Sequence, residues 1–82
     1  MTASQARALR ELALDLDAFP ADTDAGEPLP GYENEMTAGV LASILRTTAA
    51  REGTGQVHFG QADSWRRVAL RVLDRLREAA GS

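Results

Sequence analysis

The sequence predicts a mainly α fold, a small three-helix domain, and three observations support this prediction. Apolar residues recur at helical spacing in three segments, and these segments are bounded by residues that cap or stop helices. Only one short segment alternates as a strand does. The length of 82 residues suits a single domain. We therefore expect one helical domain over residues 1–82, with helices at about 3–18, 35–52 and 63–79.

The first expected helix, at about 3–18, places its apolar residues on one face. Their spacings are three, four and three, in the order Leu9, Leu12, Leu16 and Phe19. Thr2 followed by Gln5 fits a capping box, in which a hydroxyl and an amide each satisfy a backbone donor. Pro20 ends the helix, because proline disfavours helical geometry in the residue before it.

A long acidic linker is expected at 20–36, after the first helix. It holds three prolines, two glycines and five acidic residues but no basic residue. Connections of this length without secondary structure bind something, pack as an ordered strap or move freely. Leu29 and Tyr32 supply two apolar anchors, so we expect an ordered strap across the helices.

The second expected helix, at about 35–52, carries a broad apolar stripe. Asn34 or Thr37 is suited to cap its start, and Gly53 to stop it. Gly39 in the first turn costs roughly 0.5–1 kcal/mol relative to alanine. That glycine either allows a neighbouring helix to approach closely or lets the helix end fray.

A short extended segment is expected at 55–60, between the second and third helices. Val57 and Phe59 alternate around His58, and glycines stand on both sides. Asp63 or Ser64 then caps the third helix, and Gly81 closes it. With these elements the core is expected to contain ten residues: Leu9, Leu12, Leu16, Val40, Leu41, Ile44, Leu45, Val68, Val72 and Leu76.

The sequence offers no set of groups suited to catalysis or to a cofactor. Cysteine is absent, and His58 is the only histidine, without a second ligand to share a metal. Asp22, Asp24 and Glu33 have the spacing of three ligands in an EF-hand loop, but the fifth and sixth positions of such a loop are filled by the wrong residues. We therefore expect neither an enzyme nor a metal or cofactor site.

Composition bears on where the protein works and where it came from. No apolar run approaches the ~20 residues that a membrane span needs, and no signal peptide opens the chain. A small chain without cysteine is typical of the cytoplasm. All nine basic residues are arginine, which together with the many alanines indicates a high-GC coding sequence.

The third helix has the strongest charge pattern, with five arginines against three acidic residues. Arg67, Arg71 and Arg75 follow one another at four-residue spacing, where like charges repel slightly. Three explanations remain open. The row contacts nucleic-acid phosphates, it pairs with an acidic partner, or Asp74, Glu78 and the acidic linker neutralise it within the molecule.

These features favour a small non-enzymatic adaptor or inhibitor, a protein–protein interaction module that binds another protein or a second copy of itself as a homodimer. The alternative is a small nucleic-acid-binding regulator that uses the arginines of the third helix. The candidate partner-binding residues combine the extended segment, an aromatic anchor and the arginines. They are Val57, His58, Phe59, Trp65, Arg66, Arg67, Arg71 and Arg75.

Overall fold

The computed structural model describes residues 2–29, 35–51 and 59–81. In chain order its elements are α1 (Ala3–Leu16), β1 (Asp24–Pro28), β2 (Glu35–Thr37), α2 (Ala38–Ala49) and α3 (Phe59–Ala80). Three helices and a two-stranded antiparallel hairpin therefore form a mostly helical domain, as the mainly α prediction required.

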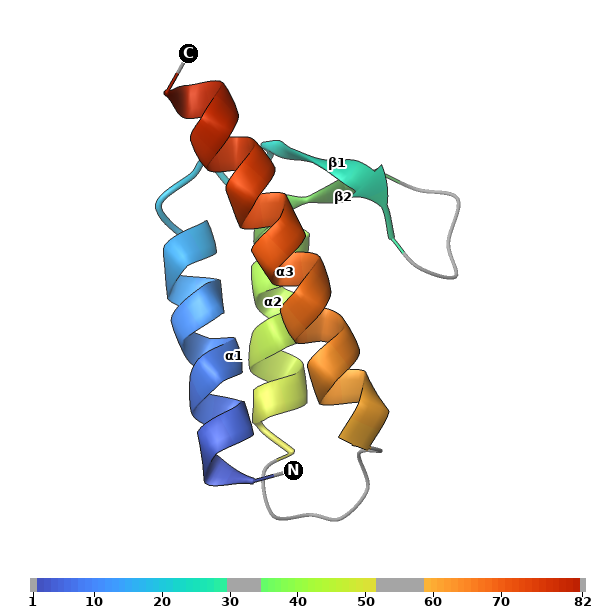
Figure 1. The fold of residues 1–82 in the computed structure, drawn as a ribbon. Coiled ribbons are helices and arrows are strands. Elements are labelled where there is room, and N and C mark those ends of the chain that lie inside the picture. Colours follow the sequence, from blue (N-terminus) through green and yellow to red (C-terminus); the bar gives the residue numbers. More distant parts are fainter. Residues whose placement is uncertain (1, 30–34, 52–58, 82) are drawn as a thin grey trace.

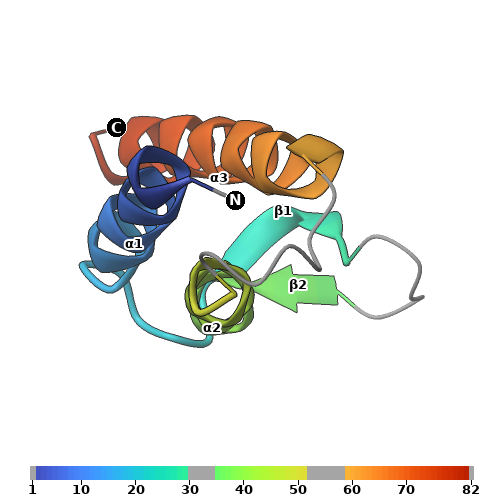
Figure 2. The same cartoon turned by 90° about the horizontal axis from the view of Figure 1, so that it is seen from below.

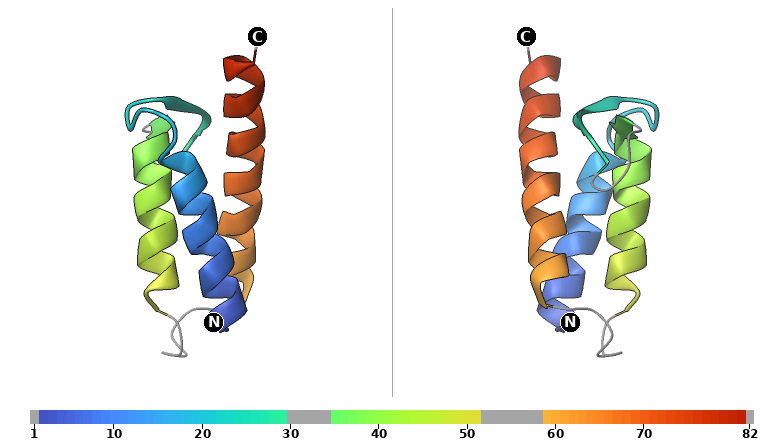
Figure 3. Two further views of the ribbon diagram at one scale, coloured as in Figure 1. Left: turned by 90° about the vertical axis from the view of Figure 1, so that its left-hand side faces the viewer. Right: turned by 90° about the vertical axis from the view of Figure 1, so that its right-hand side faces the viewer.

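The helices lie side by side, with α1 and α3 running in the same direction and α2 running opposite to both (Figure 1). Seen along the helices, α1, α2 and α3 occupy three corners, and the hairpin lies on the side of α2 and α3 that faces away from α1 (Figure 2). The side views place the hairpin near one end of the bundle, where α2 begins (Figure 3). No helix within the described part of the chain is long and apolar enough to cross a membrane.

Helix α1 begins as predicted and ends two residues early. The hydroxyl of Thr2 accepts from the backbone N–H of Gln5 at 3.2 Å, and the Thr2 N–H donates to the Gln5 side chain at 2.9 Å, which confirms the capping box. The helix stops at Leu16 because Asp17 caps it and a turn follows, closed by a bond from Phe19 N–H to the Leu16 carbonyl. The helix therefore ends two residues before the expected end at about residue 18.

The acidic linker contains regular structure that the sequence analysis did not predict. Its described ends form the hairpin, with Asp24 opposite Thr37 and Pro28 opposite Glu35, and an irregularity lies between these pairs. Ala25 and Met36 are fully buried and so anchor the two strands in the core. The strap interpretation is right in one respect, because β1 lies against α3 (Figures 1 and 2).

Helix α2 is shorter than expected because β2 takes its first three residues. Thr37 has extended backbone angles, and its hydroxyl accepts from the Val40 N–H at 3.3 Å, so the helix starts at Ala38 and not at residue 35. It ends at Ala49 instead of residue 52. The expected stop at Gly53 lies outside the described residues.

Helix α3 is longer than expected and starts at Phe59, four residues before Asp63. Phe59 and Gly60 were assigned to the extended segment, and the structure corrects this assignment for both. Residues 55–58 lie outside the described residues. At the other end Gly81 closes the helix, and its N–H donates to the Arg77 carbonyl at 3.0 Å.

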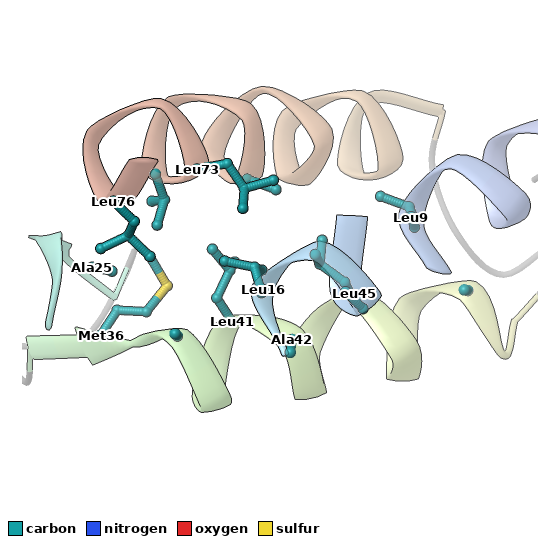
Figure 4. Packing of buried hydrophobic residues seen from close by; sticks show 14 of the residues in the cluster. Leu9, Leu16, Ala25, Met36, Leu41, Ala42, Leu45, Leu73 and Leu76 are labelled. Carbon is teal, nitrogen blue, oxygen red and sulfur yellow. The ribbon is translucent and has the colours of Figure 1, made fainter. Parts of the chain in front are cut away.

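The core lies between the three helices and continues beneath the hairpin, where Met36, Ala25 and Leu76 meet (Figure 4). Val40 was expected in the core but is 41% exposed. Three other expected core residues are only half-buried: Leu12, Ile44 and Val68. The largest fully buried side chains come from every helix and from β2. They are Leu9, Leu16, Met36, Leu41, Leu45, Val72 and Leu73.

Candidate functional site

The candidate site lies on the flank of α2 and α3 that faces away from α1. On the opposite flank, two ion pairs connect the other helices to α1. Arg46 of α2 pairs with Asp17 just after α1, and Arg77 of α3 pairs with Asp15 of α1 at 3.6 Å. The candidate site has two parts. One is a groove between α2 and α3, and the other is a row of arginines on α3 beside the hairpin.

The groove is the hollow lined by six residues of α2, its C-terminal turn and α3, and it encloses about 320 Å³. These residues are Ser43, Ile44, Thr47, Thr48, Arg51 and Trp65. Ile44 and Trp65 are half-buried, and Trp65 packs against the core. The groove therefore combines the apolar side chains of Ile44 and Trp65 with hydroxyl groups on its α2 wall, a surface suited to a side chain with both apolar and polar atoms.

The arginine row, defined as Arg67, Arg71 and Arg75, meets the hairpin through a single carboxylate. Glu27 of β1 accepts from Arg71 Nη2 at 2.8 Å and from Arg75 Nη1 at 2.9 Å. A third and longer contact joins Arg71 Nε to the second carboxylate oxygen at 3.4 Å. Glu27 thus joins two guanidinium groups that belong to successive turns of α3.

The environment of Glu27 favours its charged form. Its side chain is only 15% exposed, whereas the two arginine side chains are about half exposed. The hydrogen bond from Arg71 is the largest cause that lowers the pKa of Glu27, and Arg75 adds to it, while desolvation opposes both. The same contact raises the pKa of Arg71. Glu27 is therefore an ionised carboxylate held by two cations at neutral pH.

The backbone of β1 brings this carboxylate close to α3. Gly26 has a φ of +82°, and a Cβ atom at that position would lie 3.4 Å from Arg75 Cδ. Its N–H donates to the Asp24 side chain at 2.9 Å, which stabilises the bend. Gly26 is thus the point where the strand turns against the aliphatic stem of Arg75, and Glu27 follows directly.

Of the three explanations left open for the arginine row, neutralisation within the molecule is supported in part, because Glu27 of the acidic linker pairs with Arg71 and Arg75. No pattern in the sequence singles out Glu27 among the five acidic residues of that linker, because the choice depends on how the hairpin docks. Arg67 is exposed, and within the described residues it has no ion pair. The row therefore keeps a net positive charge toward solvent.

The structure brings only some of the predicted partner-binding residues together. Arg71 and Arg75 meet at Glu27, and Trp65 lies in the groove. Arg66 is exposed and takes no part in either feature. Phe59 is in the first turn of α3, and Val57 and His58 lie outside the described residues. Sequence reasoning missed the α2 wall of the groove, since serine and threonine on a helix carry no distinctive signal.

Metal ligation finds no support in the side-chain arrangement. Across residues 2–29, 35–51 and 59–81, no group of three or more His, Asp or Glu side chains is placed to hold a metal ion. Asp24 and Glu35 line a second hollow on the hairpin together with Glu27, but the Asp24 carboxylate is used by Gly26 and the Glu27 carboxylate by the arginines.

Comparison with known proteins gives no relative for this chain. No protein family, no curated protein and no solved structure matches it. The chain is therefore described by its own fold, a three-helix domain with a hairpin that contacts its third helix. The case for function depends on the groove and the arginine row.

Proposed function

We propose that this chain is a small non-enzymatic protein-binding module, an adaptor or inhibitor that contacts its partner through the groove between α2 and α3. The observation that carries this proposal is the position of Trp65, half-buried at the edge of the core with Ile44 across the groove. Tryptophan is enriched among residues that dominate binding energy, because it offers a large apolar area with little conformational freedom to lose.

The shape of the groove suits a helical segment better than a small molecule. Its walls are two helices, and a volume of about 320 Å³ accepts a few side chains. A partner helix that presents apolar residues at positions i and i+4 would place them against Ile44 and Trp65. Ser43 and Thr47 stand on the wall where polar atoms of the partner would be satisfied. The partner is another protein or a second copy of this chain, and we place the complex in the cytoplasm.

The nucleic-acid alternative has weaker support. The chain has a net charge of −3, and the row has only three cations. A nucleic-acid surface commonly uses about six to ten phosphate contacts, more than this row offers. We therefore keep protein binding as the proposed function.

The experiment compares capture of proteins from the native host by three forms of the chain. Thr47→Arg places a long charged side chain in the groove without entering the core, because Thr47 is exposed. Leu14→Arg is the matched control, since it introduces the same charge at a position of α1 that is 66% exposed. Wild-type protein and the control should retain a partner that Thr47→Arg loses, and circular dichroism should show all three folded.

Self-association is measured on the same three proteins by sedimentation velocity. A dimer that dissociates in Thr47→Arg but persists in Leu14→Arg identifies a second copy as the partner. The proposal is wrong if the groove variant retains every captured protein as well as the control does. It is also wrong if the wild-type chain is monomeric and captures nothing.

A further inference from the structure

The arginine row on α3 holds a carboxylate of the chain itself, and this contact suggests what else it binds. We propose that Arg67, Arg71 and Arg75 form a docking surface for an acidic protein segment, and that Glu27 is an internal competitor that keeps the surface partly closed. This inference rests on the proposed function, because it names the chemistry of a protein partner. It adds a second contact surface on the same flank as the groove.

The bound carboxylate shows how the row holds an acidic group. Arg71 and Arg75 approach the two oxygens of Glu27 at 2.8 and 2.9 Å, which is the separation of strong charge-assisted hydrogen bonds. Residues four positions apart on a helix are separated by about 6 Å along its axis, so the three arginines place positive charges at regular intervals along α3. An acidic helix or strand with carboxylates at matching intervals would meet these cations one by one.

Glu27 does not saturate the row. Each guanidinium has five N–H donors, and Glu27 uses two of Arg71 and one of Arg75. The side chains of Arg71 and Arg75 are 54% and 48% exposed, so further donors face solvent. Arg67 is exposed and has no ion pair among the described residues. Glu27 therefore pairs with two of the three cations in the row.

Buried apolar side chains hold the hairpin in the core in addition to the Glu27 carboxylate. Ala25 of β1 and Met36 of β2 are fully buried, and Figure 4 shows both beside Leu76 of α3. Apolar burial therefore anchors the hairpin, while Glu27 regulates access to the arginines. A single free carboxylate competes poorly with Glu27, which is tethered at a high effective concentration. A segment with several carboxylates can bind Arg67 first and then displace Glu27.

The probe is a fluorescein-labelled poly-glutamate peptide, whose binding is followed by fluorescence anisotropy at low salt. Glu27→Gln removes the competitor and keeps the shape of the side chain. Asp22→Asn is the matched control, because it changes the net charge equally at an exposed residue with no ion pair in the described part of the chain. A mixed-sequence DNA oligonucleotide of equal charge is measured in parallel.

We expect Glu27→Gln to bind the peptide about tenfold more tightly than wild type, a change typical of coupled sites. Asp22→Asn should bind like wild type, and adding Arg67→Gln to the Glu27→Gln protein should remove most of the gain. Thr47→Arg changes the groove and should leave the gain caused by Glu27→Gln intact, so failure of the groove proposal is distinguishable from failure of this one.

Three results would overturn the inference. They are equal gains in Glu27→Gln and Asp22→Asn, no gain in Glu27→Gln, and tighter binding of the oligonucleotide than of the peptide. Thermal denaturation checks that each variant is folded. If Glu27→Gln does not fold, Glu27→Asp takes its place, because its side chain is shorter by one carbon and should contact the two arginines less well. The same order of peptide affinities is required of it.

Discussion

Replacing Gly39 by alanine tests how tightly the start of α2 packs against the preceding connection. A Cβ atom at Gly39 would lie 2.9 Å from the Cβ of Ala21 and 3.0 Å from its carbonyl oxygen. The connection cannot easily retreat, because the Gly39 N–H donates to that carbonyl at 3.0 Å and the Ala38 N–H donates to the Thr23 carbonyl at 2.8 Å. These bonds satisfy two donors that a helix start leaves without helical partners.

Two effects of Gly39→Ala oppose each other. Alanine improves helix propensity by about 1 kcal/mol in a helix interior. Overpacking costs about 1–3 kcal/mol, and weakening the hydrogen bond to Ala21 costs about 1 kcal/mol more. The clash prevails, so the free energy of unfolding should fall by about 1–3 kcal/mol, which lowers the Tm by roughly 4–24 °C in a domain of this size.

The assay is thermal and urea unfolding of four proteins in a double-mutant cycle: wild type, Gly39→Ala, Ala21→Gly and the double variant. Ala21→Gly removes the nearest atom of the clash but leaves the carbonyl, so the double variant should recover part of the loss and show a favourable coupling between the two sites. A Tm that rises in Gly39→Ala would refute the reasoning. So would strictly additive effects.

Three further predictions concern the hairpin and the cap of α2. Glu27→Gln should cost about 1 kcal/mol at pH 7, the upper end for solvent-screened ion pairs. The folded chain lowers the pKa of Glu27 from its ordinary 4.5, so this contribution is present above pH 4.5 and is lost as the pH falls through the lowered pKa. The urea midpoints of wild type and Glu27→Gln should therefore converge in acid. A gap between the two midpoints that does not change with pH would contradict this assignment. Met36→Ala should lower the free energy of unfolding by about 2–5 kcal/mol, because it leaves a cavity beneath the hairpin. Leu14→Ala, at an exposed position, should change it by no more than about 0.5 kcal/mol. Equal losses of Tm in the two variants would contradict the assigned burial. Thr37→Ala removes the hydroxyl that accepts from Val40 N–H and should cost about 1 kcal/mol in urea unfolding, and an unchanged midpoint would show that this cap has no effect.

The helices were largely predictable because their signals are local. The spacing of Leu9, Leu12 and Leu16 defines one face of a helix, and Thr2 with Gln5 defines its start, all within about 15 residues of chain. Tertiary context decided where the other helices begin. Thr37 caps α2 because the three residues before Ala38 pair with β1, and a periodicity argument does not include that competition.

The hairpin escaped prediction because its strands are short and contain residues that disfavour strands. Gly26 and Pro28 lie in β1, and the pairing joins segments that are separated along the chain. Burial of Ala25 and Met36 stabilises this arrangement, and such burial becomes visible only when α3 is in place. The exposure of Val40 has a similar origin, since the helical stripe is wider than the surface that its neighbours cover.

The sequence by itself determined a small, mainly helical domain with a run of arginines on its last helix, because periodicity, caps and charge spacing are properties of neighbouring residues. The tertiary structure alone decided that Glu27 meets Arg71, a residue 44 positions away, and that Trp65 faces α2 across a groove. Those contacts depend on how the hairpin and the helices dock. Docking is set by the sum of burial and hydrogen bonding over the whole core, which no single segment encodes.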